Sequence, residues 1–243
     1  MKILTGKNLK KPYRLLIYGT AGVGKSTLAS TAKRPIFIDI EGGLSRIDCA
    51  RTPLIKSISD LGNAITFLLT QKDVYSTVVV DTADQLDTLI QDEICKKEGK
   101  ESLSQFGYGS GFEMLNRVWI KILSGLEKLV DNGFNLIILA HPQTKVFNDP
   151  TLEPYDKITM RVHQKPSALL MGRMDAVFYY AYETMVTGKN NEKKKALTTG
   201  SRILHTKHKA SFEAKSRYDL PDKIEVNDRF NLSIFEDKIR QEK

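Results

Sequence analysis

The sequence predicts an α/β fold with a mostly parallel central sheet flanked by helices. Short, nearly continuous apolar runs alternate with longer segments of helical pattern, as expected of strands that are buried on both faces and joined by crossover helices. A glycine-rich loop follows the first apolar run and precedes the first helical segment. The 243 residues are enough for one such core and too few for two large domains.

The predicted strands and helices alternate regularly up to His141. Strands are expected at residues 14–18, 35–40, 76–81 and 134–140, with a further short strand at 54–58. Helices are expected at residues 25–32, 61–71, 84–98 and 112–131. The last helix is followed by Asn132 and Gly133, a pair that favours a helix C-terminus. This alternation is the order that builds a parallel sheet.

The pattern changes after His141. A polar stretch with several prolines, residues 142–154, is too long for an ordinary connection, so a functional loop is predicted there. The expected core is completed by a short helix, a strand and a basic C-terminal β-hairpin, at residues 167–172, 175–182 and up to 201–206. We expect one domain over residues 1–221 and a C-terminal appendage over residues 222–243.

Positive charge is concentrated late in the chain. The net charge is +8, and residues 186–217 contain nine Lys or Arg against two acidic residues, Glu192 and Glu213. Such a segment is either a solvated lysine-rich hairpin or a surface that contacts an anionic polymer.

Several protein classes are excluded by composition. Cys49 and Cys95 have neither metal-site nor disulfide-framework spacing, and the N-terminus lacks the apolar segment of a secretory signal. No apolar run approaches the roughly 18 residues that span a bilayer. We therefore expect a cytoplasmic protein in a reducing compartment, without a membrane partner.

The glycine-rich loop matches the phosphate-binding pattern G-x-x-x-x-G-K-[ST]. In this pattern backbone N–H groups surround the β-phosphate, the lysine reaches the β- and γ-phosphate oxygens, and the hydroxyl after it binds Mg²⁺. We therefore predict that ATP is bound by Gly19, Thr20, Ala21, Gly22, Val23, Gly24, Lys25, Ser26 and Thr27, with Ser26 as a Mg²⁺ ligand.

An acidic residue at the end of a neighbouring strand usually holds the same metal through water. The run Val78-Val79-Val80 leads directly to Asp81, which is therefore the predicted Walker B residue. Alternatively, Asp81 caps the next helix, although Asp84 is placed to do that instead.

Hydrolysis also needs a group that polarises the attacking water. The second predicted strand ends in Asp39 and Glu41, followed by two glycines that allow close backbone approach. Either carboxylate is placed at the strand end beside the phosphate loop. The preference for Glu41 rests on a family resemblance.

These residues resemble the RecA-like recombinase core of the P-loop nucleotide triphosphatases. Members of that family carry an Asp-Thr-Glu-Gly-type motif at the second strand, where the glutamate activates water. Here the motif reads Asp39-Ile40-Glu41-Gly42, so the resemblance implies Glu41 as the general base. It also implies a RecA-like ATPase domain.

The fourth strand of that family ends in a polar residue that senses the γ-phosphate and signals to a DNA-binding loop. Here the strand ends in Leu139-Ala140-His141, followed by Pro142 and Gln143, which departs from the usual Asn-Gln. The resemblance implies His141 as the sensor, with Gln143 as the second choice. The alternative is a structural histidine.

Residues 212–218 resemble the Lys-x-Arg element that DnaB-like and other RecA-fold motors insert into the ATP site of a neighbouring subunit. Lys215 and Arg217 are two residues apart and so share a face of a strand. The resemblance implies that both act in trans on the γ-phosphate, within a homo-oligomeric filament or ring. Alternatively, they are two more charges of a basic segment.

Taken together, residues 12–221 look most like small phage-type ATPases described as single-strand annealing proteins. The resemblance implies a DNA-stimulated ATPase that binds single-stranded DNA and promotes annealing and homologous recombination. It also implies a single-stranded DNA-binding protein as a partner, and the host cytoplasm as the location if a phage encodes the chain.

DNA-binding loops follow the third and fourth strands of that family, which here points to residues 105–111 and 145–165. Aromatic side chains there are expected to stack on bases and cations to meet phosphates. The candidates are Phe106, Tyr108, Lys145, Phe147, Lys157, Arg161 and Lys165. Alternatively, these aromatic residues fold back on the core.

Three other functions fit parts of the pattern. A ring-forming DNA motor shares the trans Lys-Arg element but normally carries an extra domain, for which this chain has no room. A small-molecule kinase needs an arginine-bearing lid, and the basic hairpin has few arginines. A nucleotide-dependent protein switch needs no DNA.

Overall fold

The computed structural model describes residues 11–151, 153–187 and 195–233. Its strands are β1 (Arg14–Gly19), β2 (Pro35–Asp39), β3 (Ala50–Arg51), β4 (Thr77–Asp81), β5 (Asn135–Ala140), β6 (Pro142–Phe147), β7 (Tyr155–Met160), β8 (Ala176–Thr187), β9 (Lys195–His205), β10 (Lys215–Ser216) and β11 (Lys223–Val226). Its α-helices are α1 (Lys25–Ser30), α2 (Ile58–Leu68), α3 (Ala83–Lys97), α4 (Ser110–Asp131) and α5 (Gln164–Arg173). Short 3-10 turns occur at Leu44–Arg46, Leu103–Gln105 and Gly107–Gly109.

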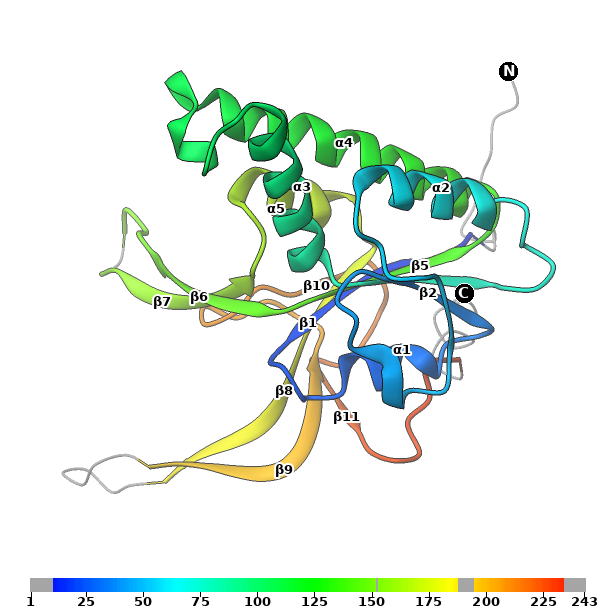
Figure 1. The fold of residues 1–243 in the computed structure, drawn as a ribbon. Helices are drawn as coiled ribbons and strands as arrows, with labels where there is room; N and C mark the ends of the chain where they lie inside the picture. Colours follow the sequence, from blue (N-terminus) through cyan, green and yellow to red (C-terminus); the bar gives the residue numbers. More distant parts are fainter. Residues whose placement is uncertain (1–10, 152, 188–194, 234–243) are drawn as a thin grey trace, which may run out of the picture.

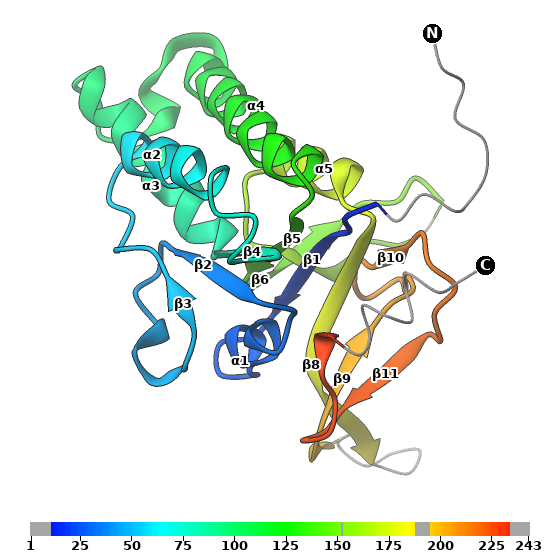
Figure 2. The same ribbon diagram turned by 90° about the vertical axis from the view of Figure 1, so that its right-hand side faces the viewer.

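The main sheet is parallel at its centre and antiparallel at one edge. Its strand order is β11-β9-β8-β1-β5-β4-β2-β3, and β10 pairs with β8. The strands from β8 to β3 are parallel to one another, whereas β9, β10 and β11 join by antiparallel pairing. Figure 2 shows β9 and β11 at the edge beyond β8. The phosphate-loop strand β1 therefore lies inside the sheet, between β8 and β5.

Helices cover both faces of this sheet (Figure 1). Because neighbouring residues of a strand point to opposite faces, Leu16 and Ile138 pack in the core beneath α2 to α5, while Leu15 and Ile137 pack in the core beside α1. All four side chains are buried. Burial on both faces explains the nearly continuous apolar sequence of these strands.

The predicted fold class is confirmed: a mainly parallel central sheet, helices on both faces, and a β8–β9 hairpin towards the C-terminus. The strand expected at residues 54–58 is wrong. The Ser57 hydroxyl accepts a hydrogen bond from the backbone of Asp60 at 3.0 Å and caps α2, which begins at Ile58. A strand of two residues, β3, pairs with β2 just before that segment.

The loop expected after His141 is also wrong. Residues 142–147 and 155–160 form an antiparallel hairpin, β6–β7, that makes a separate sheet. The prolines that suggested a loop lie at the start of β6 and near the turn, where a missing N–H costs no ladder hydrogen bond. Figure 1 shows this hairpin projecting beyond the main sheet, on the same side as the β8–β9 hairpin.

Part of the basic segment lies outside the described residues, namely Lys189, Lys193 and Lys194.

In the part of the chain that the structure describes, no helix is long and apolar enough to cross a membrane.

Residues 222–233 pack against the rest of the chain. β11 extends the sheet by pairing with β9, and Leu232 is fully buried in the core cluster that contains α1. The backbone N–H of Leu232 donates to the Thr31 hydroxyl at the end of α1, at 2.9 Å. The described residues after Pro221 therefore continue the same core.

We predict that Leu232→Ala lowers the free energy of unfolding by about 2–5 kcal/mol, because it leaves a cavity under α1. Urea unfolding followed by circular dichroism measures the loss. The matched control is Leu54→Ala, since Leu54 is 44% exposed and should cost much less. Equal effects of the two substitutions would contradict the packing described here.

Candidate functional site

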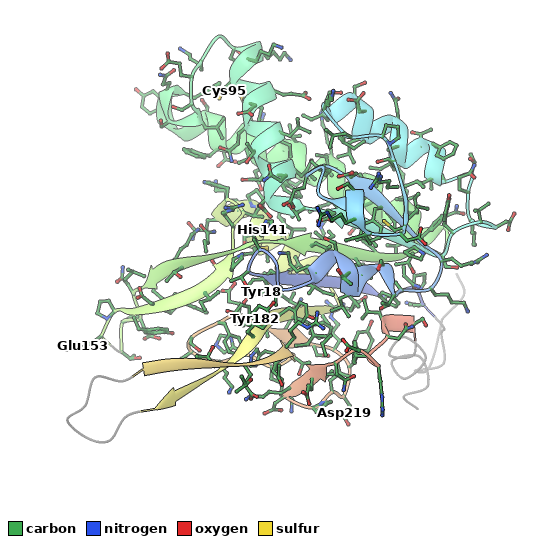
Figure 3. The ribbon with its side chains drawn as sticks, turned by 60° about the horizontal axis from the view of Figure 1, so that its bottom comes forward. Tyr18, Cys95, His141, Glu153, Tyr182 and Asp219 are labelled. Atoms are coloured by element: carbon green, nitrogen blue, oxygen red, sulfur yellow. The ribbon has the colours of Figure 1, made fainter. Side chains whose placement is uncertain are left out.

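The ends of four parallel strands meet at one edge of the sheet. Tyr18 lies opposite Ala140, so the loop after β1 begins beside His141, the residue that follows β5. Asp39 lies opposite Asp81, which brings the ends of β2 and β4 together. Figure 3 shows His141 and Tyr18 near each other at this edge. The site therefore lies at the carboxyl ends of these strands, where polar residues that are distant in sequence come close together.

The phosphate loop has the backbone that its sequence pattern requires. Gly22 and Gly24 have φ values of 77° and 95°, which side chains with a Cβ rarely adopt. The ammonium of Lys25 donates to the carbonyl oxygens of Gly19 at 2.9 Å and Thr20 at 3.1 Å, so it lies within the curve of the loop. Lys25 is 6% exposed. Burial lowers its pKa, while the charges of Glu41 and Asp81 oppose that shift.

Ser26 and Asp81 face each other across the sheet edge. The Ser26 hydroxyl donates to a carboxylate oxygen of Asp81 at 2.7 Å. Burial raises the pKa of Asp81 to about 6; the hydrogen bond from Ser26 opposes the shift and the charge of Glu41 adds to it. A hydroxyl and a carboxylate at this distance are the oxygen donors that Mg²⁺ prefers.

Glu41 and Asp39 have different surroundings. The Asp39 carboxylate accepts the backbone N–H of Gly42 at 2.7 Å and so supports the turn after β2. Glu41 is fixed through its own N–H, which donates to the Asp81 carbonyl at 3.1 Å, and its carboxylate is 34% exposed. An exposed carboxylate held by its backbone at the edge of the site suits a base; a carboxylate engaged in a turn does not.

His141 lies between two carboxylates. Its Nε2 is 3.9 Å from Glu41, and its Nδ1 is 3.0 Å from Asp84. The backbone N–H of His141 also donates to Asp84, at 2.9 Å. The ring is thus held from one side, with its other nitrogen towards Glu41.

Asp84 is the residue whose role the sequence did not reveal. It lies in the first turn of α3, but its carboxylate accepts from His141 and, at 2.7 Å, from Arg161 at the end of the β6–β7 hairpin. Burial favours the neutral acid, yet the hydrogen bonds from Arg161 and His141 outweigh it and lower the pKa of Asp84. A chain of contacts therefore joins Glu41 to Arg161.

Gln143 is hydrogen-bonded to the backbone at the end of β7 and just after it. Its amide donates to the carbonyl oxygens of Met160 at 2.6 Å and Val162 at 3.4 Å. It closes the base of the β6–β7 hairpin, while His141 occupies the strand end.

Lys215 and Arg217 lie far from the phosphate loop of their own chain. Lys215 pairs with Val177 on β8, whereas the loop begins at the level of Tyr180. Arg217 binds the Asp175 carboxylate at 3.0 Å, beside Arg14 at the start of β1. β1 is about 17 Å long at 3.4 Å per residue, so Arg217 is at the opposite end of that strand.

The residues predicted to contact DNA fall into two groups. Phe106 packs partly buried against the core, and Lys157 is 7% exposed and paired with Glu213 at 3.4 Å, so Lys157 is not available at the surface. The ion-pair partner of Lys157 is distant in sequence, which explains why its burial was not evident from the sequence.

The other predicted contacts are exposed or lie at the rim of the β6–β7 hairpin. Tyr108 is fully exposed and Phe147 is 41% exposed. Lys145 is also exposed, whereas Arg161 pairs with Asp84 and Lys165 pairs with Glu113. Figure 1 shows their elements, the loop before α4, the hairpin and the start of α5, on one side of the molecule.

The described residues fit Mg·ATP. Positive φ angles let the loop approach phosphates closely, Lys25 supplies a cation, and Ser26 with Asp81 supplies oxygen ligands. Among the described residues, no cluster of three or more His, Cys, Asp or Glu could hold a metal by protein side chains alone. A Mg²⁺ ion held by Ser26 and Asp81 would take further ligands from phosphates and water.

We predict that Asp81 makes stability depend on pH. Its folded pKa of about 6 lies above the ordinary 3.8, so between these values the folded chain binds more protons than the unfolded chain. The free energy of unfolding should therefore fall as the pH rises from about 4 to about 7, and Asp81→Asn should remove this component. Urea unfolding of both proteins across that range measures it; identical pH profiles would contradict the assignment.

Comparisons with known proteins place the chain in a family. A family model described as an AAA domain matches residues 11–218, which is most of the chain. The SPbeta prophage-derived uncharacterized protein YorG of Bacillus subtilis (strain 168) is 28% identical over 134 residues, which are 52% of this chain and 40% of that relative. The chain thus matches less than half the length of this relative.

A search of solved structures finds the KaiC-like protein PH0186 of Pyrococcus horikoshii OT3, with 11% identity, a TM-score of 0.40, and coverage of 80% of this chain and 77% of that one. The family match classifies the protein, because it covers most of the residues that form the sheet and the phosphate loop. The chain belongs to the AAA domain family.

Proposed function

We propose that this protein is a RecA-like ATPase that binds single-stranded DNA and promotes annealing during homologous recombination. The observation that carries the ATPase part is the convergence of Lys25, Ser26, Asp81, Glu41 and His141 at one sheet edge. We propose a catalytic domain over residues 1–221 and a C-terminal appendage over residues 222–243, of which the described part, residues 222–233, packs into the same core.

The proposed roles follow from the contacts. Lys25 and the loop N–H groups bind the phosphates, and Ser26 with Asp81 would hold Mg²⁺, which neutralises phosphate charge when bound. Glu41 takes a proton from the attacking water, because its carboxylate is exposed while its backbone is fixed to Asp81. His141 lies 3.9 Å from Glu41 and is placed to respond to the γ-phosphate.

The position of Lys215 and Arg217 supports action in trans. Arg217 is about 17 Å from the phosphate loop of its own chain, along β1, and its side chain is 55% exposed. A neighbouring copy in a filament or ring could receive both cations at its γ-phosphate. We therefore propose a homo-oligomer in which each site is completed by the next subunit.

The DNA-binding part rests on the exposed residues around the β6–β7 hairpin. Tyr108 and Phe147 offer rings for stacking, and Lys145, Arg161 and Lys165 offer positive charge. The similarity to a prophage-derived protein of Bacillus subtilis supports a phage context. We propose the cytoplasm as the location, with a single-stranded DNA-binding protein as a further partner.

One experiment tests this function. The steady-state ATPase rate is measured with and without single-stranded oligonucleotide, together with mobility shifts on single and double strands at two salt concentrations. We expect turnover that changes with the single strand, and binding that weakens with salt. Turnover that ignores DNA, with no mobility shift, would favour a protein-directed switch instead.

We predict that Glu41→Gln retains ATP binding and loses turnover by at least 100-fold, roughly the contribution of a general base. The amide keeps the size of the side chain but cannot take a proton. Nucleotide binding is followed by calorimetry and turnover by phosphate release. Asp39→Asn is the matched comparison, and a larger loss of turnover in that variant would reassign the base to Asp39.

We predict that Arg217→Ala loses ATPase activity, and that added Lys25→Ala subunits partly restore it, because they donate an intact Arg217 to their neighbours. The control is the double variant Lys25→Ala/Arg217→Ala, which should restore nothing. The measurement is turnover as a function of the mixing ratio. The absence of any difference between the two added proteins would argue against action in trans.

A further inference from the structure

A pocket of about 330 Å³ lies beside Asp84, at the base of the β6–β7 hairpin. Its walls include Asp84 and Asp87 of α3, Gln143 and Lys145 of β6, and Arg161 and His163 before α5. It therefore lies between the contact chain that begins at Glu41 and the outer surface of the hairpin. Figure 3 shows that β6 and β7 run outward from the region of His141 towards Glu153.

The two carboxylates of this pocket already have partners. Asp87 accepts from Trp119 at 2.7 Å, from Gln91 at 2.8 Å and from the backbone of His163 at 3.3 Å. Asp84 accepts from His141 and Arg161. Asp84 is thus paired with a cation, Arg161, whereas the hydrogen-bond donors to Asp87 are neutral.

The two cationic side chains of the pocket, Lys145 and Arg161, have hydrogen-bond donors that no described residue uses. Lys145 forms no ion pair with any of the described residues. Arg161 uses one nitrogen, Nη2, for Asp84, and its side chain is 54% exposed, so the guanidinium keeps further N–H groups for a ligand. Lys145 and His163 line the same pocket, so these groups lie close together. The open side of the pocket thus suits an anion.

We propose that this pocket binds a phosphodiester group of the single strand, and that the phosphate shares Arg161 with Asp84. Asp84 is then a positioning residue for His141. This inference rests on the proposed function for the identity of the anion, but the sharing of Asp84 is observed directly in its two hydrogen bonds.

The direction of the effect follows from the number of partners on Asp84. Without DNA, Arg161 and His141 both donate hydrogen bonds to the carboxylate of Asp84. When a phosphate draws Arg161 outward, the hydrogen bond from His141 to Asp84 becomes stronger, because a charged acceptor is no longer shared. The ring is then held more firmly with Nε2 towards Glu41, and turnover rises.

The test compares Arg161→Ala, Arg161→Lys and Asp84→Asn with the wild type. The control, Arg51→Ala, removes an exposed arginine from β3 at the far edge of the sheet. ATP turnover is measured with and without a single-stranded oligonucleotide, and with inorganic phosphate at equal ionic strength. Oligonucleotide affinity is measured over a range of salt concentrations.

We expect Arg161→Ala to raise the DNA-free rate towards the DNA-stimulated rate of the wild type, so that the ratio of the two rates falls to unity. A plot of log affinity against log salt concentration should be less steep for this variant than for the wild type. The expected difference in slope is about 0.7, the value for one single-strand phosphate contact. Arg161→Lys should restore part of the stimulation, and Asp84→Asn should be slow with or without DNA. Arg51→Ala should behave as the wild type.

Three results would overturn the inference. The first is a DNA-free rate of Arg161→Ala at or below that of the wild type, which a merely structural role would give. The second is an unchanged salt slope in that variant. The third is equal stimulation of the wild type by inorganic phosphate, which would remove the phosphodiester as the ligand.

Failure of the proposed DNA role has a different signature. In that case the wild type hydrolyses ATP but ignores every oligonucleotide, while a raised DNA-free rate in Arg161→Ala still supports the sharing of Asp84.

Discussion

The parallel register of the central strands is the constraint on which the site depends. Parallel strands place their carboxyl ends at one edge, and β5 lies between β1 and β4, so the phosphate loop, Asp81 and His141 come together there. The residues involved are more than 100 positions apart in the chain, from Gly19 to His141. The two apolar cores on either side of the sheet hold this register, because a slip of one residue would exchange the two faces.

The polar groups at this edge are fixed in place by hydrogen bonds to one another. Asp81 binds Ser26, and the backbone of Glu41 binds the carbonyl of Asp81. Asp84 holds both His141 and Arg161. Buried carboxylates are costly unless they have such partners, so each contact also stabilises the site as a whole. The same contacts give a physical route from the hairpin surface to the nucleotide, because Arg161 and Glu41 are separated only by Asp84 and His141.

Local patterns predicted much of the fold and part of the site. The loop from Gly19 to Thr27 and the strand ending at Asp81 were readable because their residues are adjacent in the chain. The role of Asp84 was missed because its partners, His141 and Arg161, are distant in sequence. The sequence of the β6–β7 hairpin indicates a loop because of its prolines, which lie where they break no ladder hydrogen bond. The sequence also indicates an exposed Lys157, because the burial of Lys157 against Glu213 depends on tertiary packing.

The central claim is that the phosphate loop binds and hydrolyses ATP, and Lys25→Ala tests it most directly. Lys25 donates to two loop carbonyls and is buried inside the loop, whereas Lys56 is exposed and serves as the matched control. The measurement is ATP binding and phosphate release for the wild type, Lys25→Ala and Lys56→Ala. We expect binding and turnover in the wild type and Lys56→Ala, and neither in Lys25→Ala. Equal turnover in all three folded proteins, or none in the wild type, would contradict it.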